Sequence, residues 1–137
     1  MAIVFNGAGS AFTNGAATSC GTTFSANINN TYVVVVYGIS ASSNISSITQ
    51  TNVNWQFQAW VQNIAGGGIS VEVWVGVPTG TPGTGITVNN STSCQFGFVV
   101  YAYTGLSSRT DVVEDVWIGH ASGNQVLFPA YGTGGAV

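Results

Sequence analysis

The strongest constraint on the fold of this chain is a period-two alternation of apolar and other side chains that recurs along the sequence. One face of the segment that begins at Cys94 is formed by apolar residues, namely Cys94, Phe96, Phe98, Val100 and Ala102. This period is typical of a half-buried β-strand, whereas no segment shows the 3.6-residue period of an amphipathic helix. The sequence therefore predicts an all-β protein.

Two further segments alternate in the same way, and the pattern predicts which side of each strand faces the core. In residues 53–62 the expected core residues are Trp55, Phe57, Ala59 and Val61. In residues 69–76 they are Ile69, Val71, Val73 and Val75. Glu72 is then expected to face solvent beside Trp74. Residues 32–37 are apolar on both faces, as in a central strand.

Clusters of Gly, Ser, Asn and Pro separate these segments at intervals of about 8–12 residues, which is typical of a sandwich or barrel. We predict a single antiparallel β-sandwich, jelly-roll or immunoglobulin-like, over residues 1–137, with about nine or ten strands. The expected strands lie near residues 2–6, 17–26, 31–38, 46–52, 53–62, 69–76, 84–89, 94–104, 111–119 and 124–130.

Charge is nearly absent. Asp, Glu, Lys and Arg make up 4% of the 137 residues, against about 25% in an ordinary domain. Arg109 is the only cationic side chain apart from His120, so phosphate neutralisation and nucleic-acid binding are not expected. No apolar run approaches the ~20 residues of a membrane span.

Short motifs occur in a fixed order over about residues 20–106: Tyr32-Val33-Val34-Val35-Val36, Ile45-Ser46-Ser47-Ile48-Thr49, Trp55, Val71-Glu72-Val73-Trp74, Ile86-Thr87-Val88 and Tyr101-Ala102-Tyr103-Thr104-Gly105. This succession resembles the jelly-roll or immunoglobulin-like sandwich modules of archaeal and bacterial surface filament proteins and of phage or virus structural proteins. The resemblance implies an adhesive or architectural role rather than an enzyme.

Cys20 and Cys94 are expected on strands, and two readings are open. A disulfide would close a loop of about 75 residues and stabilise the fold by roughly 3–4 kcal/mol. The alternative is a pair of buried thiols. The extracellular character of the other features favours the disulfide.

Four Asn-x-Ser/Thr sequons are candidates for glycosylation in turn-like segments, at Asn29, Asn44, Asn89 and Asn90. A chain this rich in Asn, Ser and Thr forms such sequons by chance as well, so the motif alone does not establish modification.

Candidates for chemistry are few. Asp111, Glu114 and Asp115 form a weak Ca²⁺ candidate, but the alternative is a solvated edge paired with Arg109. His120 could belong to a hydrolase triad, but the sequence contains no nucleophile-elbow motif to accompany it. Glu72 with Glu114 or Asp115 could form the carboxylate pair of a glycosidase, a hypothesis that the sequence supports only weakly. We expect no catalytic residue, no cofactor and no bound metal.

Aromatic and apolar residues away from the presumed core are candidates for contact with other molecules. Three readings are open for Trp60, Trp74, Tyr101 and Tyr103: an interface between copies, a sugar-stacking platform, or a second buried face. The termini supply further interface candidates, namely Ile3, Phe5, Val126 and Phe128. Strands 2–6 and 124–131 either complete their own sandwich or are exchanged between subunits.

These observations predict a self-assembling structural protein, either a virion protein or a subunit of an extracellular filament. An uncharged surface removes the repulsion and the edge-strand lysines that normally prevent association between copies. The expected partners are copies of the same chain, with glycan binding by surface aromatics as the alternative.

Overall fold

The structure is a computed structural model that describes residues 3–40, 43–62 and 69–105. These residues form no helix and eight β-strands: β1 (Val4–Phe12), β2 (Ala17–Thr23), β3 (Thr31–Ser40), β4 (Ile45–Gln50), β5 (Val53–Gln62), β6 (Ile69–Pro78), β7 (Gly85–Cys94) and β8 (Gly97–Thr104). Every strand pair is antiparallel. The predicted all-β class is confirmed, and the expected strands at 111–119 and 124–130 lie outside the described residues.

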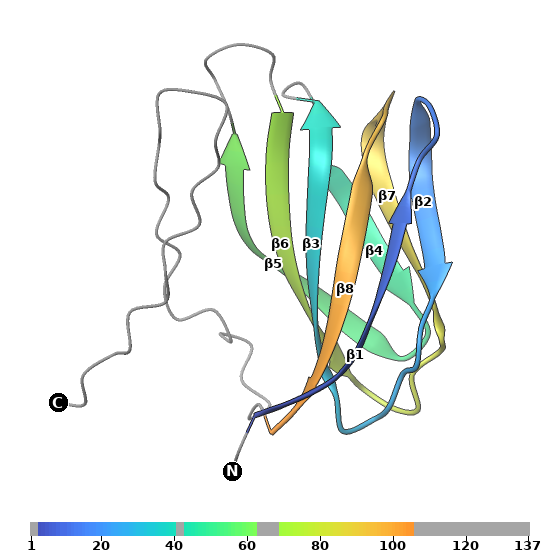
Figure 1. Ribbon diagram of the computed structural model, residues 1–137, viewed down its shortest axis with the longest axis vertical. Helices are drawn as coiled ribbons and strands as arrows, with labels where there is room; N and C mark the ends of the chain where they lie inside the picture. Colours follow the sequence, from blue (N-terminus) through green and yellow to red (C-terminus); the bar gives the residue numbers. More distant parts are fainter. Residues whose placement is uncertain (1–2, 41–42, 63–68, 106–137) are drawn as a thin grey trace, which may run out of the picture.

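The strands form two sheets that lie over each other as layers (Figure 1). The larger sheet has the order β1-β8-β3-β6-β5, and the smaller has the order β2-β7-β4. Pairing is nested, because β1 pairs with β8, β2 with β7, and β3 with β6. The result is a β-sandwich-like arrangement in which the first and last described strands are neighbours.

The core lies between the sheets, with β3 at the centre of the larger one. On β3, Tyr32, Val34 and Val36 are completely buried and lie beside the inward residues of β8. The smaller sheet contributes Ile48, Ile86 and Val88 to the same cluster. The predicted core face of the segment after Cys94 is confirmed, since its four apolar residues from β8 and the turn before it are fully buried: Phe96, Phe98, Val100 and Ala102.

A bulge in β3 reverses the face to which the side chains after Tyr37 point. The pairing register shifts between Tyr37 and Ile39, and Gly38 there has φ +79°, a left-handed backbone that favours glycine. Tyr37 is therefore 38% exposed, while Ile39, two residues later, is buried. In an unbroken strand the two would share a face.

The predicted orientation of β6 is wrong. Its residues Glu72 and Trp74 pair with Val36 and Val34 of β3, which face the core. Glu72 is consequently only 5% exposed rather than solvated, although it does lie beside Trp74 as expected. Val71 and Val73, which the pattern placed in the core, are half-buried on the outer side of the larger sheet, and Ile69 is 58% exposed. Val75 is buried as predicted, although it points to the same outer side as Val73.

A second bulge changes the expected face of β5. The register shifts between Phe57 and Ala59, so that Phe57 pairs with Trp74 and Trp60 pairs with Glu72. Trp60 therefore joins Phe57 on the side that faces the smaller sheet. Ala59 and Val61 lie instead on the outer face, where they pair with Val73 and Val71, which corrects their predicted place in the core.

The first strand is longer than predicted. The strand expected near residues 2–6 continues to Phe12 in β1, and its register shifts between Phe5 and Gly7. β1 pairs with β8 of its own chain.

The described residues include no helix long and apolar enough to cross a membrane.

Candidate functional site

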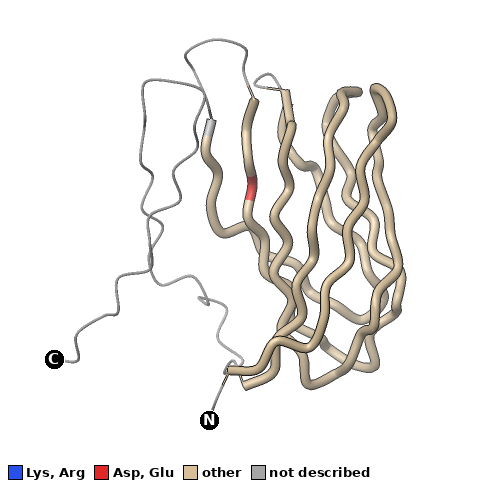
Figure 2. The backbone as a smooth tube through the Cα atoms, viewed as in Figure 1, with Lys and Arg blue, Asp and Glu red and all other residues tan. Residues whose placement is uncertain are grey.

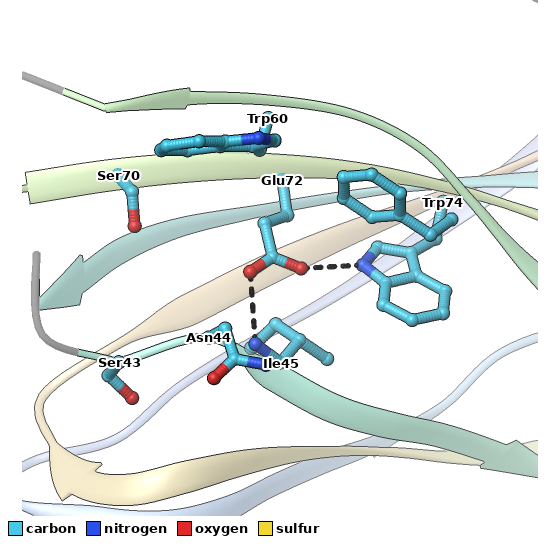
Figure 3. Close-up of a pocket in the computed structure, with 8 residues that line it drawn as sticks. Ser43, Asn44, Ile45, Trp60, Ser70, Glu72 and Trp74 are labelled. Atoms are coloured by element: carbon cyan, nitrogen blue, oxygen red, sulfur yellow. Dashed lines mark hydrogen bonds between the residues drawn. The ribbon is translucent and has the colours of Figure 1, made fainter.

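The larger sheet extends beyond the smaller one next to β4 and leaves a cleft of about 420 Å³. β6 and β5 form one side of the cleft, and the start of β4 forms the other (Figure 3). Its lining combines aromatic and polar residues: Ser43, Asn44, Ile45, Phe57, Trp60, Ser70, Glu72 and Trp74. A volume of this size is within the range of small-molecule sites, about 300–1,000 Å³.

Glu72 lies at the base of this cleft with both carboxylate oxygens engaged. Oε1 accepts the backbone N–H of Ile45 at 3.0 Å, and Oε2 accepts the indole Nε1–H of Trp74 at 2.9 Å. Figure 3 shows the carboxylate directed toward the start of β4. Both partners are N–H donors. An ionised carboxylate can only accept hydrogen bonds, so both contacts suit the charged form of Glu72.

Glu72 is also the only charged side chain among the described residues, as Figure 2 shows. Burial of a carboxylate is costly unless other groups compensate its charge. The two neutral N–H donors satisfy its lone pairs in part but bring no positive charge.

Aromatic rings form the walls around this carboxylate. Phe57 and Trp74 meet edge to face, with ring centroids 5.5 Å apart. Phe57 is 47% exposed and Trp60 is 52% exposed, because no strand of the smaller sheet covers them. Such half-exposed rings beside a buried charge can bind a ligand, while the described residues of the lining include no second carboxylate, histidine or cysteine.

The structure separates the four aromatic residues singled out in the sequence. Trp60 and Trp74 lie together in the cleft, whereas Tyr101 and Tyr103 lie on the outer face of the larger sheet. There Tyr103 meets Phe5 of β1 at 5.8 Å between ring centroids. Among the terminal candidates, Ile3 and Phe5 are exposed, and Val126 and Phe128 lie outside the described residues.

The predicted disulfide is absent, since Cys20 and Cys94 are both free thiols. Cys20 pairs with Val88 across β2 and β7, whereas Cys94 pairs with Ala17. Along β2, Cys20 is three residues from Ala17, the partner of Cys94, and three residues of extended strand span about 10 Å. This exceeds the ~7 Å between Cα atoms that a disulfide can span. Cys94 Sγ instead accepts a hydrogen bond from Asn90 Nδ2 at 2.9 Å.

The four sequon asparagines differ in exposure. Asn29 and Asn44 are exposed, and Asn89 is half-buried with its Nδ2 donating to Ser47 Oγ at 3.1 Å. Asn90 is buried, and its Oδ1 accepts a hydrogen bond from Ser43. A glycan at Asn90 would therefore require local unfolding, whereas the first two positions are sterically open.

The remaining predicted sites lie outside the described residues. These are the Ca²⁺ candidate Asp111, Glu114 and Asp115, together with Arg109 and His120. Within the described part of the chain, no group of three or more His, Cys, Asp or Glu side chains is placed to hold a metal ion.

Sequence reasoning missed Phe57 and the start of β4 as parts of a site. A strand that carries Glu and Trp two residues apart was a usable signal, because the two side chains must share a face. The bulge that brings Trp60 to the same cleft has no comparable signal in the sequence.

Comparisons with protein-family models, with curated proteins and with solved structures found no match to this chain.

Proposed function

We propose that this protein is a self-assembling structural subunit, of a virion or of an extracellular filament, whose copies pack through the outer face of the larger sheet. The observation that carries the proposal is the composition of that face. An antiparallel sheet that faces water normally alternates apolar residues inside with polar residues outside. Here the outward positions at the centre of the sheet, on β3, β6 and β8, are largely apolar as well, whereas the outward positions of β5 include Asn54 and Gln56.

The centre of the outer face is built from valines of three adjacent strands. Val35 of β3 pairs with Val73 of β6 on one side and with Val99 of β8 on the other. Val33 lies next to Val75 and Tyr101 in the same way, although Val75 itself is only 1% exposed. All these positions face away from the core that Val34 and Val36 enter. A contiguous apolar patch of this kind is typical of an interaction surface.

Exposed aromatic rings continue the patch toward β1. Phe12 and Tyr37 stack with centroids 6.4 Å apart and their planes within 11°. They cover Gly97 of β8, where an added Cβ would lie 2.7 Å from Phe12 and 2.9 Å from Tyr37. Phe5 extends the surface at the other end of β1. Large aromatic side chains of this kind are enriched where proteins associate.

The strand order supports the jelly-roll form of the sandwich over the immunoglobulin-like form. Nested pairing of β1 with β8, β2 with β7 and β3 with β6 is what results when a long hairpin of eight strands is rolled up. Jelly rolls are used in viral capsids and in lectins. This topology favours the virion or surface location that the sequence predicts.

The distribution of charge favours assembly over a lectin role. Among the described residues, the outer face contains no charged side chain, so these surfaces of two copies do not repel each other. A platform of four aromatics for sugars is less well supported, because Trp60 and Trp74 lie on the side of the sheet opposite to Tyr101 and Tyr103. Exchange of strands 2–6 and 124–131 between subunits stays a separate prediction.

Light scattering after size-exclusion chromatography, with electron microscopy of the peak, tests the proposal. The natural protein is expected to form regular assemblies as its concentration rises. Val35→Lys places a charge at the centre of the outer face and is expected to give a folded monomer by circular dichroism. A natural protein that stays monomeric at every concentration would overturn the proposal.

The matched control is Thr49→Lys, which adds the same charge to an exposed position on the smaller sheet. It is expected to assemble like the natural protein. If Thr49→Lys prevents assembly and Val35→Lys does not, the interface lies on the smaller sheet instead.

A further inference from the structure

The cleft at Glu72 contains a negative charge for which the described residues supply no cation. Glu72 is nearly buried, and the described segments contain no Lys, Arg or His. Backbone and indole N–H groups contact its oxygens, but they are neutral. A buried carboxylate is most stable when a positive charge lies nearby. The cleft is therefore complementary in charge to a cation.

The aromatic walls of the cleft also favour a cation. The faces of Trp and Phe rings carry partial negative charge and attract cations that lie within about 6 Å of the ring centre. Phe57, Trp60 and Trp74 all line the cleft with Glu72. Figure 3 shows the two tryptophans on either side of the carboxylate. Aromatic rings around an anionic group are the arrangement by which proteins bind organic ammonium ions.

The hydrogen bonds around the cleft distinguish between classes of cation. Both oxygens of Glu72 already accept one hydrogen bond each. Ser70 Oγ donates to the carbonyl of Ile39 at 3.3 Å, and Ser43 Oγ donates to Asn90. A primary ammonium carries three N–H donors and a guanidinium five, and they could use the remaining lone pairs of Glu72 and of the serine hydroxyls only if the donors are aligned with those lone pairs. A quaternary ammonium has no N–H group and needs only charge and ring faces.

We propose that this cleft is a binding site for a small quaternary ammonium group, held by Glu72 through its charge and by Phe57, Trp60 and Trp74 through their ring faces. A cleft of about 420 Å³ accommodates such a group together with part of the molecule that carries it. The half-exposed Trp60 and Phe57 leave the site open to solvent. The site lies on the side of the larger sheet opposite to the proposed assembly face, so the two proposals can fail independently.

A titration of the full chain with tetramethylammonium chloride and with choline chloride, at constant ionic strength, tests this inference. The Trp74 indole N–H resonance in a ¹H–¹⁵N spectrum reports on the cleft. We expect saturable shifts with both salts and much smaller shifts with 3,3-dimethylbutan-1-ol, the neutral analogue of choline. Equal binding of the neutral alcohol would show that the cleft recognises apolar shape alone and would overturn the proposal.

Two variants locate the interaction. Trp60→Ala removes a half-exposed ring without opening the core, and we expect affinity for tetramethylammonium to fall about two- to fivefold. Glu72→Gln removes the charge and is expected to weaken binding about tenfold or more. Tyr103→Ala, on the outer face, is the control and is expected to bind like the natural protein. Unchanged affinity in Trp60→Ala would place the ligand elsewhere, even if Glu72→Gln fails to fold.

Competing occupants give distinct results. Tighter binding of methylammonium or guanidinium than of tetramethylammonium would overturn the quaternary class. Binding of methyl pyranosides at the Trp74 resonance without any response to tetramethylammonium would make the cleft a sugar site. If the Trp74 resonance shifts with tetramethylammonium in the Arg109→Ala variant but not in the natural protein, the chain's own arginine occupies the cleft. That result would overturn the proposal of an external ligand.

Discussion

Glu72 on β6 and Ile45, the first residue of β4, are joined by a 3.0 Å hydrogen bond that crosses from the larger sheet to the smaller one. The bond is buried, and Oε2 of the same carboxylate holds the indole of Trp74. One side chain therefore fixes both the start of β4 and the wall of the cleft. A polar link between sheets is directional, unlike the apolar contacts around it.

We predict that Glu72→Ala lowers the free energy of unfolding by roughly 2–4 kcal/mol. The substitution leaves the N–H groups of Ile45 and Trp74 without acceptors, and unsatisfied buried donors cost about 1–3 kcal/mol each. Urea denaturation monitored by tryptophan fluorescence measures the change. Glu72→Gln keeps one acceptor oxygen and should lose less. A loss below about 0.5 kcal/mol, the value of an ordinary surface substitution, would contradict the role assigned to this carboxylate.

We predict that Gly76→Ala is destabilising by about 1–3 kcal/mol, because the indole of Trp55 covers this glycine. An added Cβ at Gly76 would lie 2.8 Å from three ring carbons of Trp55, closer than carbon atoms approach in folded proteins. The ring packs against the core and against Tyr32, so it cannot move away without disturbing both. Thermal unfolding measures the effect.

Gly85→Ala is the matched control for this prediction. Gly85 also lies in a strand, but an added Cβ there meets no atom within 4 Å. Its melting temperature is expected to equal or slightly exceed that of the natural protein, since alanine loses less backbone entropy on folding. Equal effects of the two substitutions would show that the Trp55 contact is not the cause.

The positions of the strands could be predicted from the sequence because alternation and turn residues act locally. The expected strands at 17–26, 31–38, 53–62 and 69–76 correspond to β2, β3, β5 and β6. The core face of β8 was also predictable, since Val100 and Ala102 alternate with Tyr101 and Tyr103, whose hydroxyl groups cannot be buried as cheaply. Local pattern and final structure agree wherever only one face of a strand suits the core.

The face of β6 could not be predicted because its valines form the more apolar face, yet Ser70, Glu72 and Trp74 are the residues on the side of the core. Only the pairing with β3 decides between the two faces. The bulge before Ala59 likewise depends on pairing with β6 rather than on any residue of β5. The cleft arises from the overhang of one sheet beyond another, a relationship between distant segments that no local pattern contains.

We predict that the two thiols react at very different rates with a thiol reagent such as 5,5′-dithiobis(2-nitrobenzoate). Cys94 is half-exposed near the end of β7, whereas Cys20 is buried in the core cluster, and burial raises the pKa of its thiol. Because the thiolate is the reactive form, Cys20 is doubly protected. One thiol should be labelled in the folded protein and two in denaturant. A Cys94→Ser variant should lose the fast phase. No labelling before reduction would instead indicate the disulfide.

We predict that the fold is stable to alkali only up to about pH 9 and loses stability as the pH rises further. Burial raises the pKa of Cys20 above its ordinary 9.0 and the pKa of Tyr32 above its ordinary 10.0, although hydrogen bonds from the backbone at Gly21 and from Asn27 and Asn30 oppose the rise. In this range the unfolded chain has released protons that the folded chain still holds. The folded state therefore binds more protons, and the free energy of unfolding falls with pH.

Tyr32→Phe and Cys20→Ala separate the two contributions. The Tyr32 hydroxyl accepts from Asn27 N–H and donates to Asn27 C=O, both at 2.9 Å, so Tyr32→Phe should lose about 1–3 kcal/mol at neutral pH yet show a shallower decline above pH 10. Cys20→Ala should show a shallower decline from pH 9. Urea titrations at pH 7 to 11 measure both slopes. A natural protein whose stability rises between pH 9 and 11 would contradict the burial of both groups.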